Sequence, residues 1–141
     1  MLIPYPFAFL SGALAFRVLA SARRDATLAR SADHLRTAGL VTAVAAALPG
    51  IIDYFTAVPD GPPKRTATNH ALSNSSALLC FAAAAMNGRQ GTEDRRTLVL
   101  EALGTLCLSV GGWLGGKLSY HHGVGVLEGP ERIRNMRLQN G

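Results

Sequence analysis

Histidine is the residue type of this 141-residue chain best suited to bind a cofactor, and two of its four histidines are adjacent. His121 and His122 lie in the segment GGKLSYHHGVGV, residues 115–126, which ends a long apolar stretch. His70 opens another apolar stretch, and Asp53 closes the one before it. Imidazole nitrogens ligate haem iron and transition-metal ions, and a carboxylate accepts the second ring N–H of a ligating histidine. These residues form one site only if the fold brings their segments together.

Charged residues are absent from four long stretches, which indicates membrane-spanning helices. The stretches without Asp, Glu, Lys or Arg are 1–16, 37–52, 66–88 and 102–116. With flanking residues, each approaches the roughly 17–25 residues that cross a hydrocarbon core. We therefore predict an all-α integral membrane four-helix up-down bundle, with helices at about 4–20, 35–55, 70–86 and 98–120. The bundle would occupy residues 1–127, and a short basic polar tail would follow at 128–141.

A soluble helical bundle with an alanine-rich core is the alternative fold, because the mean hydropathy of +0.19 is unremarkable. Such helices normally carry charged residues along one face at a 3.6-residue spacing, and these segments do not. The third predicted helix is the least apolar, since Ser73, Asn74, Ser75 and Ser76 lie within it. In a bilayer these four polar groups must face protein, not lipid.

Basic residues in the predicted connections, 21–34, 56–69 and 87–96, set the expected orientation. The first and third connections with their flanks hold Arg23, Arg24, Arg30, Arg36, Arg89, Arg95 and Arg96, whereas the second holds Lys64 and Arg65. Lys117, Arg132, Arg134 and Arg137 on the same side as the second connection narrow this difference. Lys and Arg accumulate on the cytoplasmic side, so both termini should lie outside the cytoplasm. Arg17, near the inner end of the first helix, is expected to extend to the interface. The net charge of +5 fits lipid headgroups, and no aromatic–basic pattern suggests nucleic acid.

This topology gathers polar residues from several helices near the outer end. They are Tyr5, Asp53, Tyr54, His70, Asn74, Tyr120, His121 and His122. His34 falls in the first predicted connection, at the opposite end, and cannot share their site. Stripes of small residues lead to the outer polar groups: Gly39, Ala43, Ala46, Gly50 and Asp53; Gly104, Gly111, Gly115, Ser119 and His122; and His70, Asn74 and Ala77. Such stripes usually let membrane helices pack closely.

Three motifs resemble a family of four-helix bacterial membrane proteins catalogued as domain of unknown function 2231. The motifs are GGWLGGKLSYHHGVGV at the exit of the last helix, GIIDY and HALSN. In the family pattern, His122, His70 and Asp53 stand at matching positions, and His121 stands at a variable one. The chain departs at its start, where LIPYPFAF, with Pro4, replaces a segment that often has two histidines. The resemblance covers essentially the whole chain and implies a multi-pass protein of the bacterial inner (plasma) membrane.

The family has no settled activity, but its members are found joined to, or encoded beside, Rieske iron–sulfur domains and other redox proteins. The resemblance therefore implies electron transfer with a Rieske-type or cytochrome partner protein. A haem b requires axial ligands on opposite sides of the ring, and His70 and His122 on antiparallel neighbouring helices fit this. Gly111 and Gly115 would leave a slot for the porphyrin. The other expected haem-site residues, which would hold propionates or orient an imidazole, are Asp53, Asn74 and Tyr120.

Two other interpretations remain open at this point. One is a transition-metal ion bound by His70, His121, His122 and Asp53, although successive helical side chains point about 100° apart and His121 suits this less well. The other is a non-enzymatic membrane scaffold or interaction subunit, in which the histidines meet carbonyls or headgroups and Asp53 pairs with Lys64 or Arg65. No motif identifies an enzyme. The lipid bilayer is the expected partner in every case, and a homo-oligomer stays open.

Overall fold

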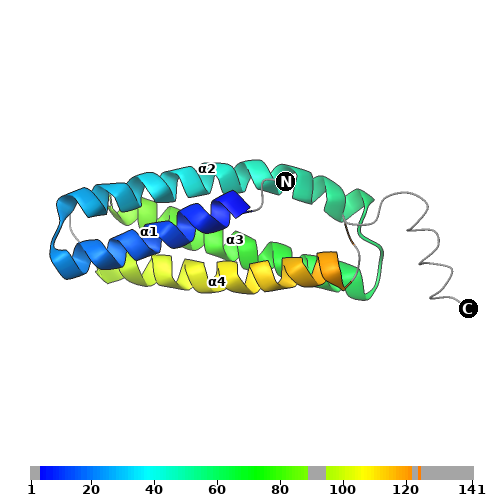
Figure 1. Cartoon of the computed structure of the whole chain (residues 1–141). Helices are drawn as coiled ribbons and strands as arrows, with labels where there is room; N and C mark the ends of the chain where they lie inside the picture. The colour runs from blue at the N-terminus through cyan, green and yellow to red at the C-terminus, as the bar shows by residue number, and fades with distance from the viewer. Residues whose placement is uncertain (1–3, 89–94, 122–123, 125–141) are drawn as a thin grey trace, which may run out of the picture.

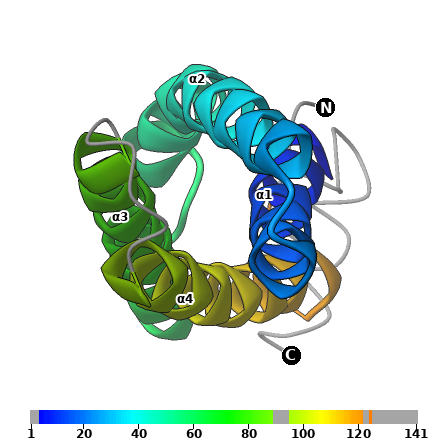
Figure 2. The ribbon, with the colours of Figure 1, turned by 90° about the vertical axis from the view of Figure 1, so that its left-hand side faces the viewer.

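The computed structural model describes residues 4–88, 95–121 and 124, and these residues form four helices without any strand. The helices are α1 (Pro4–Arg23), α2 (Ala26–Thr56), α3 (Pro62–Gly88) and α4 (Arg95–Tyr120). Consecutive helices run antiparallel (Figure 1). Viewed along the bundle, α1 and α3 each lie between α2 and α4 (Figure 2). The predicted all-α four-helix up-down bundle is confirmed, and the proposed domain boundary at 127 lies outside the described residues.

Helices α2 and α3 begin well before the predicted spans, at Ala26 and Pro62. The Asp25 carboxylate caps α2 by accepting a hydrogen bond from the Thr27 backbone N–H at 2.7 Å. Pro62 and Pro63 occupy the first turn of α3, where the missing N–H groups would have no partner in the helix. Segments 26–34 and 62–69 are therefore helical, and their prediction as connections is wrong. Apolar runs mark where a chain crosses a hydrocarbon core, but a helix continues through polar residues beyond it.

The turn between α1 and α2 is only two residues long. Arg24 adopts a left-handed conformation with φ 53°, and the Asp25 N–H donates to the Ala20 carbonyl at 3.1 Å. This is the hydrogen bond of a Schellman motif, in which glycine usually holds the left-handed position. The sequence carries arginine there instead, so the end of α1 has no glycine signal.

Glycines allow close packing in two pairs of helices, α1 with α2 and α3 with α4. A Cβ on Gly39 of α2 would lie 2.5 Å from Leu10 Cδ2 of α1, and one on Gly104 of α4 would lie 2.8 Å from Phe81 Cδ2 of α3. Both contacted side chains belong to the buried core cluster, which consists of Leu10, Ala77, Phe81 and Leu108. The interpretation of the small-residue stripes as packing surfaces agrees with these contacts.

Three of the described helices are long and apolar enough to cross a membrane: Tyr5–Arg23, Ala26–Thr56 and Arg95–Tyr120.

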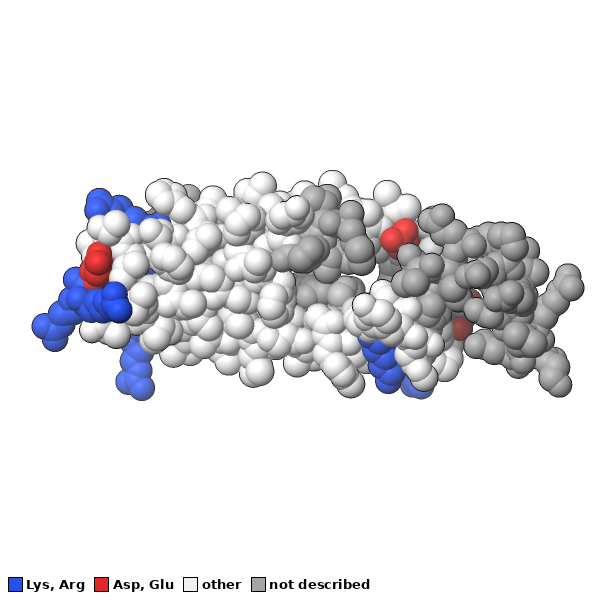
Figure 3. Space-filling model, in the orientation of Figure 1, with Lys and Arg blue, Asp and Glu red and all other residues white. Residues whose placement is uncertain are grey.

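Four consecutive polar residues in α3 spread around the whole helix, so they cannot all face a neighbour. Asn74 is half-buried but Ser75 is exposed, so the expectation that all four face protein is wrong for Ser75. On the face shown in Figure 3, charged side chains gather at the two ends and leave an uncharged band between them. This is the charge distribution of a bundle that spans a bilayer.

Candidate functional site

Four of the predicted site residues meet at the interface between α3 and α4, and we call them the imidazole cluster: His70, Asn74, Gly111 and Gly115. The His70 ring lies against α4, where its Nδ1 is 2.8 Å from the Gly111 carbonyl oxygen. The Asn74 side chain, one turn further along α3, places its Nδ2 3.0 Å from His70 Nε2. The predicted helix faces therefore bring these residues together.

The two partners of the imidazole assign its tautomer. A carbonyl oxygen only accepts hydrogen bonds, so His70 Nδ1 carries the proton and donates it to Gly111. The Nε2 atom then carries no proton, and the Asn74 amide nitrogen lies 3.0 Å from it. A histidine held at Nδ1–H by a backbone carbonyl presents Nε2 as its ligand atom, which is the usual arrangement in metal sites. In this structure the Asn74 Nδ2 lies close to both ring nitrogens, 3.0 Å from Nε2 and 3.4 Å from Nδ1.

The glycine slot expected for a porphyrin is filled by protein. A Cβ on Gly115 would lie 2.9 Å from His70 Cε1, and one on Gly111 would lie 2.9 Å from Asn74 Cγ. Both distances are shorter than ordinary van der Waals contact. The residue types suit one axial ligand, and in this arrangement the space beside Gly111 and Gly115 is occupied by an imidazole and an amide.

The other predicted site residues do not join this cluster. Asp53 is exposed near the end of α2, and the Gly111 carbonyl takes the role expected of it toward His70. Lys64, a suggested partner of Asp53, donates instead to the Tyr54 carbonyl. Tyr120 is 92% exposed. His122 lies outside the described residues.

A metal site is not assembled by the described part of the chain. Residues 4–88, 95–121 and 124 contain no group of three or more His, Cys, Asp or Glu side chains placed to hold an ion. His121 is exposed at the end of α4. Cys80 and Cys107 are free thiols on α3 and α4.

A second group of polar residues lies at the end of the bundle opposite His70, and the sequence did not lead us to predict it. We call it the charge quartet: Arg17 of α1, Asp33 and Arg36 of α2, and Glu101 of α4. The Arg36 guanidinium donates to Glu101 Oε1 at 2.8 Å and to Asp33 Oδ1 at 2.7 Å. Arg17 donates to Asp33 Oδ1 at 2.5 Å and lies 3.7 Å from Glu101 Oε2. Two guanidinium and two carboxylate groups thus form a ring whose formal charges cancel.

Burial distinguishes the charge quartet from a surface ion pair. The Glu101 side chain is fully buried and that of Arg36 is 5% exposed, whereas that of Asp33 is 43% exposed at the edge. Among the described residues, nothing hydrogen-bonds to Glu101 Oε2 or to the Nε atoms of the two arginines. Buried charges are stabilised only where partners compensate for lost hydration, so each member depends on the others.

The quartet corrects two expectations about single residues. Arg17 does not extend to the interface, because its guanidinium binds two carboxylates inside the bundle. Arg36 is paired in the same way, which leaves six arginines for the first and third connections. His34 lies on α2 and not in a connection, exposed beside the quartet at the end opposite His70.

A signal for the quartet does exist in the sequence. Arg17 directly follows one charge-free stretch, and Arg36 and Glu101 each directly precede another. Ionisable residues at the edge of three predicted spans, all at the same end of an up-down bundle, are candidates for mutual pairing.

Comparison with known proteins agrees with the membrane interpretation. The model of the family described as "Predicted membrane protein (DUF2231)" matches residues 1–128. No curated protein and no solved structure matches the chain.

Proposed function

Because the chain belongs to the DUF2231 family of predicted membrane proteins, we propose that it is a non-enzymatic multi-pass membrane subunit. Its buried polar residues hold helices together and do not perform a reaction. The observation that carries this proposal is that each of the two polar groups makes a side-chain hydrogen bond between helices. Arg36 of α2 binds Glu101 of α4, and His70 of α3 binds the backbone of α4. Interhelical hydrogen bonds of this kind help membrane helices associate.

The proposal assigns His70 a role in packing. We expect His70→Ala to lower the free energy of unfolding by about 1–3 kcal/mol, because it removes the ring that fills the gap beside Gly115 and leaves Asn74 without its partner. Unfolding in a fixed detergent, followed by circular dichroism, measures the change. His34→Ala, which replaces an exposed histidine, is the matched control and should have little effect.

A b-type haem protein that transfers electrons near the outer end is the second candidate. It is favoured by the fixed tautomer of His70, which directs the Nε2 lone pair away from the Gly111 carbonyl. On this alternative His70 supplies one ligand, His122 the other, and the Asn74 amide gives up its contact. A Rieske-type or cytochrome protein would be the redox partner. Bound haem would supply one-electron chemistry.

An absorption spectrum separates the two candidates. We expect purified protein from haem-replete cells to lack a Soret band and to hold no stoichiometric zinc or copper in elemental analysis. A sharp Soret band, with about one haem per chain in a pyridine haemochrome assay, would favour the second candidate. The band should then disappear in both His70→Ala and His122→Ala and persist in His121→Ala.

We propose that both termini lie outside the cytoplasm of a bacterial inner membrane, because the arginines concentrate at the connections between α1 and α2 and between α3 and α4. Single cysteines test this in a background without Cys80 and Cys107. An impermeant maleimide added to intact spheroplasts should label Asp60→Cys, in the turn after α2, and should not label Ser21→Cys near the end of α1. Both positions are exposed, so reactivity reports the side of the membrane. The reverse labelling pattern would invert the orientation.

A further inference from the structure

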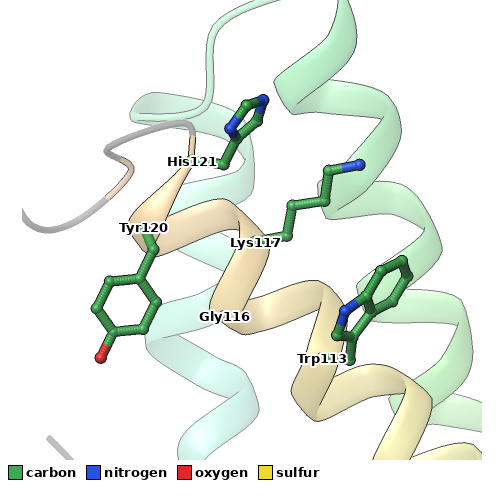
Figure 4. Close-up of a pocket in the computed structure, with 5 residues that line it drawn as sticks. All are labelled: Trp113, Gly116, Lys117, Tyr120 and His121. Carbon is green, nitrogen blue, oxygen red and sulfur yellow. The ribbon is translucent and has the colours of Figure 1, made fainter.

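We infer that the outer end of α4 carries a binding site for an anionic phospholipid, in a surface hollow of this helix. The hollow has a volume of about 510 Å³. It is lined by Trp113, Gly116, Lys117, Tyr120 and His121 (Figure 4). Each of these residues lies three or four positions from at least one other, so they share one face of the helix.

The charges of α4 place this hollow at the level of lipid headgroups. Arg95 and Arg96 begin the helix and Lys117 lies in its last turn, with no charge between Glu101 and Lys117. From Arg95 to Lys117 the helix rises about 33 Å, which matches the thickness of a hydrocarbon core of about 30 Å. Lys117 therefore reaches the interface opposite the charge quartet, and Trp113 lies about 6 Å deeper.

The two kinds of side chain in the hollow match the two parts of a phospholipid. Lys117 Nζ lies 5.8 Å from the centre of the Trp113 ring and forms no ion pair with a described residue. Figure 4 shows the Trp113 and Tyr120 rings on opposite sides of Gly116, with Lys117 and His121 toward the helix end. Tryptophan and tyrosine favour this interfacial depth. The phosphate would lie at Lys117, and the upper acyl chain would pass over Gly116 between the rings.

Gly116 provides the room for the lipid. A Cβ at this position would meet no atom within 4 Å, in contrast to the glycines that pack against α3. A larger side chain there would fill the hollow without forcing neighbouring atoms to move. Zwitterionic lipids carry a compensating positive charge, so the lysine favours lipids whose headgroup has a net negative charge.

The single tryptophan of the chain makes the site directly measurable. Fluorescence of Trp113 is recorded in vesicles that contain brominated phosphatidylglycerol or brominated phosphatidylcholine, since bromine on the acyl chain quenches a tryptophan in contact with it. We expect the anionic lipid to quench at lower mole fraction, with a relative affinity of roughly fivefold, the effect of one interfacial lysine.

Three variants test the assignment. Lys117→Gln should remove the preference, and Gly116→Leu should do the same by filling the hollow. Arg65→Gln removes an exposed cation from the same end of the bundle but not from the hollow, and it should leave the preference unchanged. Circular dichroism checks that each variant is folded. Equal quenching by the two lipids in the parent protein, or equal loss of preference in Arg65→Gln and Lys117→Gln, would overturn the site.

Discussion

Replacing Glu101 by leucine should lower the free energy of unfolding by about 3–5 kcal/mol, the cost of breaking a buried ion pair by removing one partner. The carboxylate is fully buried and binds Arg36 at 2.8 Å. Without it, two guanidinium groups face one carboxylate, that of Asp33, and the quartet carries an uncompensated positive charge. Titration with dodecyl sulfate, followed by circular dichroism, measures the change.

A second substitution tests whether charge balance is the cause. Arg36→Leu combined with Glu101→Leu leaves Arg17 and Asp33 as a neutral pair, so the double variant should recover most of the lost stability. Glu101→Gln preserves the side-chain volume but removes the negative charge. It should therefore also lower the free energy of unfolding, because two guanidinium groups again face one carboxylate. If the double variant is less stable than Glu101→Leu, the quartet does not act as a charge-balanced unit.

The number and direction of the helices could be predicted because both depend on features of short, continuous segments of the chain. A stretch without charges long enough to cross a bilayer is read directly from the sequence, and short connections force antiparallel neighbours. The helix ends could not be predicted in the same way. Arg24 holds a left-handed conformation that normally selects glycine, and Asp25 caps α2 next to it, so the turn carries no pattern distinct from a polar connection.

The candidate residues of α3 and α4 could be predicted to share a face, because helical periodicity alone places them. His70 and Asn74 do contact the stripe that contains Gly111 and Gly115. The distance between the helices could not be predicted. That distance decides whether glycines leave a slot for a ligand or receive the side chains of the facing helix, and here the side chains fill the space.

The charge quartet was missed for a different physical reason. The sequence prediction treats each charged residue on its own helix, with Arg17 extended to the interface and Arg36 counted with the first connection. Arg17, Arg36 and Glu101 lie on three helices, and pairing becomes visible only when those helices are placed side by side. A long side chain at the edge of a span can extend outward to water or inward to a partner, and single-helix reasoning chooses the first.

The close packing of α3 against α4 makes Gly104 sensitive to substitution. Gly104→Ala should lower the free energy of unfolding by about 1–3 kcal/mol, because a methyl group there would lie 2.8 Å from the Phe81 ring. Phe81 is fully buried in the core cluster. Gly112→Ala is the matched control on the same helix. Its Cβ would lie 4.0 Å from Phe7, which is an ordinary contact. Because alanine has a higher helix propensity than glycine, this variant should leave the free energy of unfolding unchanged or raise it by about 1 kcal/mol.

A double-mutant cycle with Phe81→Leu identifies the contact responsible. Leucine is smaller than phenylalanine and makes room beside residue 104, so Gly104→Ala should cost less in the Phe81→Leu background than in the parent protein. Denaturation in one detergent gives all four free energies. An equal cost in both backgrounds would mean that Gly104 does not set the spacing of α3 and α4 through Phe81. Because the imidazole cluster lies along the same interface, separation of the two helices at Gly104 should also lengthen the contact between His70 and Gly111, and an NMR shift of the His70 ring resonances would report it.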